Sequence, residues 1–221
     1  MTDKFDFYDV MATLVPGILI VAFVGVLFPS IKNQLGADHE GAFTVMALTA
    51  LSIFAGQLLV AVGSLLEPLL FRTWGGRPSD IALIEGLGNR YLPKTKGVAI
   101  KAVLAAECEP DAEGVSMFIK AMALASGAGN GKVDRFNGLY AYHRTLLLLG
   151  VASFVLVVLS RSVGLAQEWS LCGFIAALVL LCGFVVLFWH RAKQRAFYFV
   201  REVLLTAERV VNEKNATKHA T

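Results

Sequence analysis

Ionisable side chains are missing from long stretches of this sequence. Only 17% of the 221 residues are Asp, Glu, Lys or Arg, whereas 56% are hydrophobic, and the mean hydropathy is +0.63. Soluble domains carry about 25% charged residues. The run from Phe43 to Leu66 contains no Asp, Glu, Lys, Arg or His. These absences exclude an ordinary soluble domain and indicate a small membrane protein with several spans.

Motifs for disulfide formation, metal binding or catalysis are equally sparse. The three cysteines form no disulfide framework, and the four histidines are scattered without a His-Glu-x-x-His or Cys-x-x-Cys motif. No ionisable residue lies inside an apolar run, which argues against proton-coupled transport. We therefore predict no catalytic residue, no metal site and no cofactor, and we do not expect an enzyme.

Four apolar runs define the expected fold. A helix of about 20 apolar residues crosses a bilayer, and a lone span must satisfy its own backbone hydrogen bonds, so each run is predicted to be a transmembrane helix. The predicted spans cover about residues 10–28, 43–66, 145–160 and 171–189. The sequence thus predicts an all-α membrane protein with a transmembrane hairpin (1–66), a helical domain (67–144), a second hairpin (145–190) and an amphipathic tail (191–221).

The distribution of Lys and Arg predicts the orientation. Eighteen of the twenty lie in the N-terminus, the 67–144 block or the tail from 191, and only Lys32 and Arg161 lie in the loops between paired spans. Cytoplasmic segments carry the excess of Lys and Arg. We expect both termini and residues 67–144 to be cytosolic. The N-terminus MTDKFDFYD is acidic, so no cleavable signal peptide is expected.

Small and polar residues gather in the second predicted span. Ser52 and Gly56 form a small-xxx-small step, Thr49, Gly56 and Gly63 recur every seven residues, and Gln57 adds one amide. Such residues let two helices approach closely in lipid. One interpretation is that this stripe packs against helices of the same chain. The other is that all five positions face a neighbouring copy and line a pore.

The 67–144 block reads as three short helices, at about 79–90, 97–107 and 111–126. The third is expected to bury Val115, Phe118, Ile119, Met122 and Leu124. The glycine-rich loop of the block, at 127–132, lacks Walker spacing and is interpreted as a turn between helices. The densest basic group of the block is a candidate site for an anionic ligand such as a nucleotide or oligonucleotide; its members are Arg90, Lys94, Lys96 and Lys101. The alternative is a solvated positive-inside face.

The tail carries a heptad-like apolar seam at intervals of three and four residues, formed by Phe197, Val200, Leu204, Ala207 and Val211. Such spacing is typical of a coiled coil, and tethering in a membrane raises the local concentration of the tails. The seam is therefore a candidate oligomerisation surface. The alternative places the tail on its own cytosolic domain or on the membrane surface.

Three segments carry a resemblance to a known group of proteins: FYDVMATLVPG at 7–17, WGGRPSD at 74–80 and RFNGLYAYHR at 135–144. With this order of spans, the chain resembles the small inner-membrane components of bacterial anti-phage defence, in particular the membrane effector of Hailong-type defence. The membrane sensor of Kiwa-type defence is a second candidate. The first resemblance implies an oligomeric channel kept shut by the product of a partner nucleotidyltransferase. The second implies an oligomeric sensor that recruits a cytosolic protein.

The functional expectation follows from these features. A channel requires an oligomer, such as a tetramer, a helix with a small or polar face, and a constriction. We expect a gated ion channel that depolarises the membrane, with the second span nearest the pore. The rival is a non-conducting sensor or scaffold that signals to a cytosolic partner. An enzyme acting on lipid is a weaker third option, because no set of acids or histidines assembles.

Overall fold

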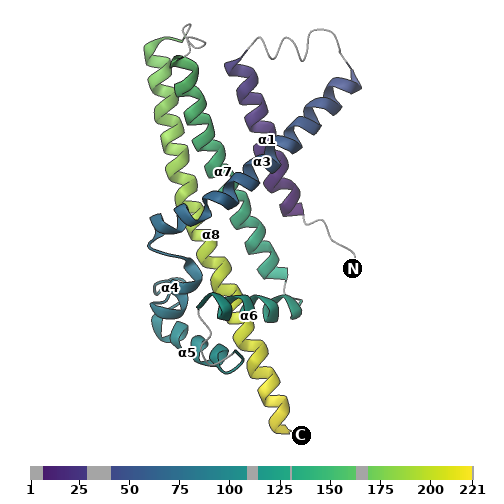
Figure 1. Cartoon of the computed structure of the whole chain (residues 1–221), viewed down its shortest axis with the longest axis vertical. Coiled ribbons are helices and arrows are strands. Elements are labelled where there is room, and N and C mark those ends of the chain that lie inside the picture. Colours follow the sequence, from purple (N-terminus) through teal and green to yellow (C-terminus); the bar gives the residue numbers. More distant parts are fainter. Residues whose placement is uncertain (1–6, 29–40, 109–113, 130, 163–168, 221) are drawn as a thin grey trace. The chain divides into compact units, whose positions relative to one another are not determined.

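The computed structural model describes residues 7–28, 41–108, 114–129, 131–162 and 169–220. Within these ranges every regular element is an α-helix, apart from an isolated bridge between Gly88 and Leu92. The helices are α1 (Phe7–Leu27), α3 (Ala42–Trp74), α4 (Pro78–Ile84), α5 (Lys94–Ala105), α6 (Gly114–Gly127), α7 (Gly131–Ser162) and α8 (Leu171–Ala220) (Figure 1). The predicted all-helical fold is thereby confirmed.

Four of the described helices, α1, α3, α7 and α8, are long and apolar enough to cross a membrane. This agrees with the four predicted spans. The membrane placement and the orientation stay predictions. The predicted loop at 30–42, with Lys32, lies almost entirely outside the described residues, as do residues 163–168 of the second predicted loop.

The chain divides into two compact units. Unit 1 comprises Met1–Leu65 and Ala141–Ala192, and unit 2 comprises Leu66–Tyr140 and Lys193–Thr221. Helices α3, α7 and α8 each begin in one unit and end in the other. The 50-residue helix α8 therefore contains both the fourth predicted span and the predicted amphipathic tail without a break.

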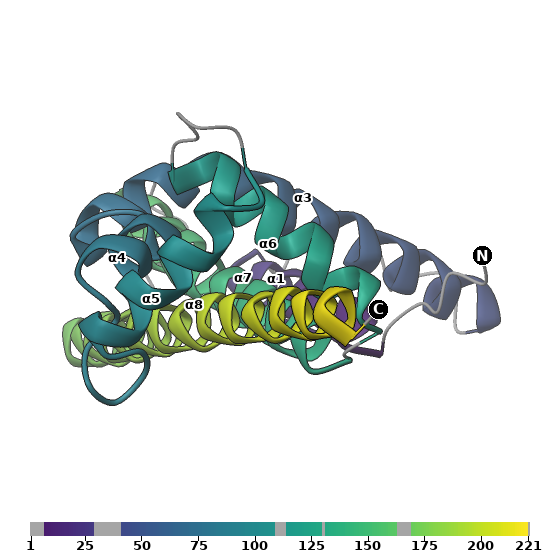
Figure 2. The same ribbon diagram turned by 90° about the horizontal axis from the view of Figure 1, so that it is seen from below.

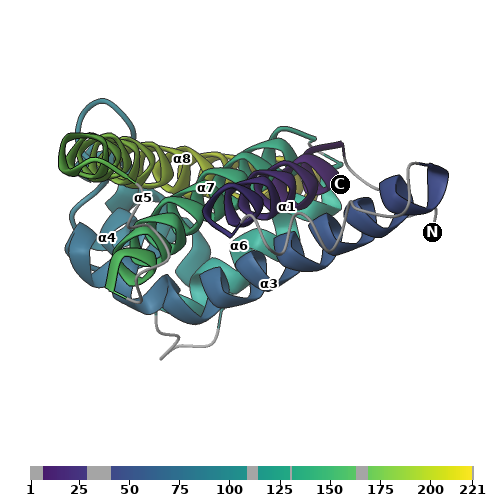
Figure 3. The same ribbon diagram turned by 90° about the horizontal axis from the view of Figure 1, so that it is seen from above.

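Unit 1 is built from the apolar helices. Helix α1 crosses α3, and α7 lies beside the N-terminal part of α8 (Figures 1 and 3). Glycine permits the second contact, because a Cβ at Gly150 of α7 would lie 2.7 Å from a ring atom of Phe184 and 3.0 Å from Val185 on α8. Most large apolar side chains of this unit point away from its interior; Leu180, for example, is 74% exposed. In lipid such exposure carries no penalty, because the acyl chains are as apolar as the side chains.

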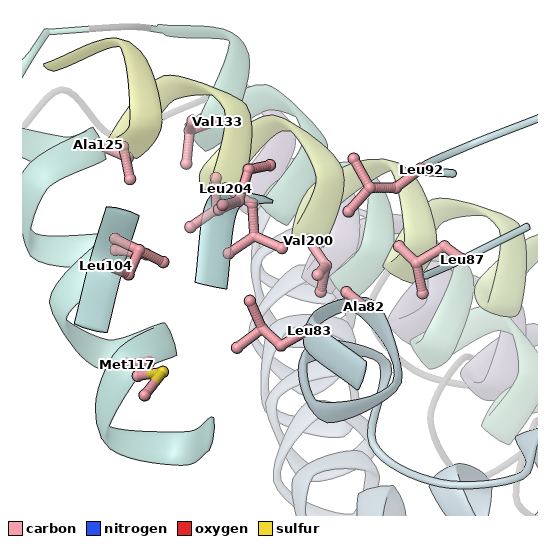
Figure 4. Close-up of a cluster of buried hydrophobic side chains, with 14 residues drawn as sticks. Ala82, Leu83, Leu87, Leu92, Leu104, Met117, Ala125, Val133, Val200 and Leu204 are labelled. Carbon is pink, nitrogen blue, oxygen red and sulfur yellow. The ribbon is translucent and has the colours of Figure 1, made fainter. Parts of the chain in front are cut away.

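Unit 2 has a conventional hydrophobic core. Helices α4, α5 and α6 lie along the C-terminal part of α8 (Figure 2), and apolar side chains of all four elements meet between them (Figure 4). Leu83, Leu104 and Leu204 are buried to 1% exposure or less. Burial of each such side chain contributes about 1.5–3 kcal/mol. Because residues 200–207 belong to this core, unit 2 is not complete without the tail.

Two predicted boundaries in unit 2 were wrong, and glycine explains both. The second span was expected to end at Glu67 and Pro68, but α3 continues to Trp74. It ends there because Gly75 and Gly76 adopt positive φ angles, and the amide N–H of Gly76 donates to the carbonyl of Phe71 at 2.9 Å, a glycine-dependent helix end.

The helix expected over 79–90 is short for a similar reason. Helix α4 begins with Pro78 and ends at Ile84, and Arg77 occupies its N-cap position. Proline suits the first helical position because its missing N–H has no partner there in any helix. The loop that follows needs Gly86, since a Cβ at this residue (φ +74°) would lie 2.6 Å from the Leu92 carbonyl oxygen.

Helix α6 buries a face that matches the predicted one only in part. Met117, Ala121 and Ala125 lie in the core, and the predicted residues Phe118 and Leu124 pack against it partly buried. The predicted core residue Ile119 is 62% exposed, and Val115 and Met122 are each 37% exposed. The helix is apolar on two faces, and the small alanines allow its closest approach to the core. Hydrophobic periodicity alone does not distinguish between two apolar faces.

Candidate functional site

The stripe of small residues on α3 packs inside the chain. A Cβ at Gly56 would lie 2.0 Å from the carbonyl oxygen of Thr13 on α1, and a Cβ at Gly17 of α1 would lie 1.8 Å from the carbonyl oxygen of Ser52. Ser52 itself is 4% exposed. The two backbones touch at this crossing, which only glycine permits. The intrachain interpretation therefore accounts for Ser52 and Gly56.

Gly63 of α3 packs against α7. A Cβ added there would lie 2.9 Å from Leu148 and 3.3 Å from the Nε atom of Arg144. The guanidinium of Arg144 also donates to the Ser64 hydroxyl at 3.3 Å, and Arg144 is only 8% exposed. Arg144 thus takes part in a contact between α3 and α7 within unit 1.

The two remaining predicted pore residues have a different environment. Thr49 and Gln57 are exposed, and the Thr49 hydroxyl is bonded to the carbonyl of Val45 on its own helix at 2.8 Å. Gln57 makes no hydrogen bond to any described residue. Adjacent residues on a helix point about 100° apart, so Gln57 and Gly56 cannot share one face. The five predicted positions therefore divide into a buried set and an exposed pair.

The predicted oligomerisation seam lies in the core of unit 2. Val200 and Leu204 point into this core (Figure 4), and these two residues, Ala207 and Val211 are each at most 4% exposed. Phe197 packs partly buried against the same core. As in the second interpretation, the tail packs on its own domain. These positions are occupied within one chain, so a homo-oligomer has to use other surfaces.

The four residues of the predicted basic group have different environments in the structure. The Lys96 ammonium forms an ion pair with Glu208 of α8 at 2.8 Å. Arg90, Lys94 and Lys101 are exposed and have no carboxylate within ion-pair distance among the described residues. Lys94 and Lys101 are seven residues apart on α5 and share a face, whereas Lys96 points toward α8. An anion that approaches α5 therefore meets two lysines of the predicted group, not three.

A second ion pair lies beyond the end of α5. Lys214 of α8 donates a hydrogen bond to the Glu107 carboxylate at 2.8 Å. This hydrogen bond lowers the pKa of Glu107 below its ordinary value of 4.5, and the charge of Lys214 acts in the same direction. The Lys96–Glu208 and Lys214–Glu107 ion pairs therefore connect the tail to both ends of α5.

Sequence reasoning missed a group of aromatic and basic side chains in unit 2, here called the aromatic–basic cluster. Its members are Arg90, Tyr91, Phe136, Lys193, Phe197 and Tyr198. The ring of Tyr91 meets the rings of Phe197 and Tyr198 edge to face at centroid distances of 5.5 and 5.1 Å, and Phe136 stacks on Tyr198 at 5.8 Å. All four rings are half-buried.

Two cations lie over the rings of this cluster. The Arg90 guanidinium is 5.8 Å from the Tyr91 centroid, and the Lys193 ammonium is 5.5 Å from the Phe197 centroid. Both distances fall within the range of cation–π attraction. The sequence signal was available in Arg90-Tyr91 and in Lys193 four residues before Phe197, but these segments are about a hundred residues apart and only the fold joins them.

The described residues include no group of three or more His, Cys, Asp or Glu side chains that could hold a metal ion. Comparison of the chain with models of protein families, with curated proteins and with solved structures gives no match in any of the three.

Proposed function

We propose that the chain is an oligomeric effector of the bacterial inner membrane that forms a gated ion channel, depolarises the membrane and is controlled through unit 2. In this proposal the protein serves anti-phage defence, a role supported by the order of its helices and by the resemblance to Hailong-type membrane effectors. A nucleotide, an oligonucleotide or another cytosolic partner serves as the controlling ligand in this proposal.

The observation that carries the proposal is the amide of Gln57. It lies in an apolar stretch of α3, it is exposed on the outside of the chain, and no described residue satisfies it. An amide moved into an apolar medium without a hydrogen bond costs several kcal/mol. A second Gln57 or a water-filled pore satisfies the amide, whereas lipid does not. Gln57 is therefore the residue of α3 that faces a neighbouring copy and the permeation path.

Control from unit 2 is supported by α8. One helix supplies both the fourth apolar stretch and four core residues of unit 2. A ligand that repacks this core also acts on the helix that enters the membrane. In this proposal the channel and its regulator share a structural element.

The test is ion flux from liposomes that contain the purified full-length protein. Gln57→Leu is expected to lower the flux by at least about tenfold, because it removes the only amide of the apolar stretch. Met46→Leu is the matched control, since Met46 is also exposed on α3, and it is expected to conduct normally. Equal flux from both variants would exclude Gln57 from the pore.

A second candidate function is a non-conducting sensor or scaffold, and the exposed face of α6 favours it. Val115, Ile119 and Met122 form an apolar stripe on the surface of unit 2. Exposed apolar patches commonly bind other proteins. Under this alternative, Ile119→Glu abolishes capture of a cytosolic protein, and the membrane potential followed with a voltage-sensitive dye never changes during expression.

A further inference from the structure

The aromatic–basic cluster combines features that a lipid headgroup requires. We propose that it binds the phosphate group of an anionic phospholipid in the inner leaflet. The proposal rests on the membrane placement and orientation given above, but it concerns a site that the channel proposal does not use. Its two cations come from separate segments, Arg90 from the loop before α5 and Lys193 from α8.

The charges of the cluster suit a phosphate. Arg90 and Lys193 lie over two rings, Tyr91 and Phe197, that are themselves in contact at 5.5 Å. An arginine fork binds phosphate oxygens in pairs, and a lysine acts as a point charge. The two cations lie over neighbouring rings, and in this proposal both contact the same phosphate. An arginine and a lysine each carry several N–H donors.

The rings suit the apolar part of the same ligand. Tyr91, Phe136, Phe197 and Tyr198 are neither buried like the core of unit 2 nor fully exposed. Half-buried aromatic rings beside cations are typical of the membrane–water boundary, where the ring contacts the glycerol and the first methylenes. A free inorganic phosphate would use only the cations. The proximity of the rings therefore favours a lipid over a soluble ion.

Sequence position supports the same source. Lys193 follows Trp189, the last residue of the fourth predicted span, by four residues. At 1.5 Å per residue this is about 6 Å along α8, and the polar headgroup layer beyond the hydrocarbon is about 5–8 Å deep. Basic side chains at this distance from a span commonly bind anionic lipids. The α5 lysines of the predicted anion site, Lys94 and Lys101, make no ring contact among the described residues.

The experiment measures the Tm of the full-length protein in a zwitterionic detergent with added short-chain lipids. Dihexanoyl phosphatidylglycerol at about ten times its Kd is expected to raise the Tm by roughly 3–6 °C. Arg90→Gln and Lys193→Gln are each expected to remove at least about half of this shift, since each removes one of two phosphate contacts. Lys193→Arg keeps the charge and the donors and is expected to retain most of the shift, whereas Arg90→Lys loses the fork and is expected to retain less of it.

Matched controls separate this site from general attraction between a basic protein and an anionic lipid. Lys120→Gln makes the same change of charge at an exposed position outside the cluster and is expected to leave the shift unchanged. A loss as large as that of Lys193→Gln would overturn the proposal. An equal rise with dihexanoyl phosphatidylcholine would show that the anionic headgroup is irrelevant and would also overturn it.

Inorganic phosphate distinguishes the two sources of the anion. If phosphate alone raises the Tm as much as the anionic lipid does, and the same two variants abolish the rise, the site binds a free anion and the lipid assignment fails. The channel proposal is tested independently by flux. A protein that conducts but shows no lipid-dependent shift contradicts only the lipid site, and a non-conducting protein with the full shift contradicts only the channel.

Discussion

The two units of this protein differ in what surrounds their closest helix contacts. In unit 1 these contacts are made at Gly17, Gly56, Gly63 and Gly150, and most large apolar side chains point outward. Unit 2 also has a close glycine contact, between Gly97 and the Ala82 carbonyl, but it adds a core of large apolar side chains that avoid water. Lipid offers no hydrophobic gain for burying a leucine, so association there depends on close backbone packing. Water makes the same burial the main driving force. The difference is physical support for the proposed membrane placement of unit 1.

The largest expected effect comes from adding volume to unit 1. Gly56→Leu places a side chain where the Thr13 carbonyl lies, so α1 and α3 must separate. The expected cost is at or above the roughly 3 kcal/mol typical of severe overpacking. The measurement is the yield of monodisperse full-length protein in detergent, together with its Tm.

Gly25→Leu is the control for this prediction, because a Cβ at Gly25 of α1 meets nothing within 4 Å. It is expected to behave like the wild type. If both variants behaved alike, close packing at Gly56 would not be what holds α1 and α3 of unit 1 together.

The next effect comes from removing volume in unit 2. Leu204→Ala leaves a cavity among residues that are buried to 1% exposure or less, and is expected to destabilise the protein by about 2–5 kcal/mol. Leu180→Ala makes the same chemical change on the apolar part of the same helix, where the side chain is 74% exposed, and is expected to change stability by less than about 0.5 kcal/mol. Thermal unfolding followed by circular dichroism compares the two. Similar shifts would mean that the two parts of α8 do not differ in packing.

These contrasts also show which features the sequence could predict. Apolar runs without charges sufficed for the long helices, because the length of a span is set by the bilayer. The positions of Ser52, Gly56 and Gln57 could not be assigned, since a small residue suits a partner in the same chain and in a neighbouring copy equally well. The face of α6 was ambiguous because both of its sides are apolar. The pairing of Tyr91 with Phe197 depends on a contact between distant segments, which no local pattern encodes.

A smaller effect concerns the ion pair between α5 and the tail. A double-mutant cycle of Lys96→Gln and Glu208→Gln is expected to give a coupling energy of about 0.2–1 kcal/mol, because the lysine side chain is 44% exposed and water screens the pair. The Arg209–Glu213 pair, at 4.0 Å with both side chains more than half exposed, is expected to give a value close to zero. Chemical denaturation of the full-length protein at low and high salt checks both. A larger coupling for the second pair would contradict the burial-based ranking.

The smallest effect is a pH dependence at Glu107. Because Lys214 lowers the pKa of this carboxyl, the folded state binds its proton less readily than the unfolded state. The stabilisation is therefore present above about pH 4.5 and is lost as the pH falls through the lowered pKa. The Tm difference between wild type and Glu107→Gln is expected to shrink as the pH is lowered from 7 to below the ordinary pKa. A difference that stayed constant over this range would show that Glu107 does not titrate with a lowered pKa.

The crossing of α1 and α3 has a consequence for tracing the ancestry of this chain. Gly17 and Gly56 each stand where a single extra carbon would collide with a backbone oxygen of the facing helix. Drift can exchange leucine, valine and phenylalanine freely on the lipid-facing sides, but it cannot exchange these two residues without dismantling the crossing. We therefore expect distant homologues with this fold to keep two glycines, each within an apolar run and separated by 38 intervening residues. This pair would identify them even where most other residues differ.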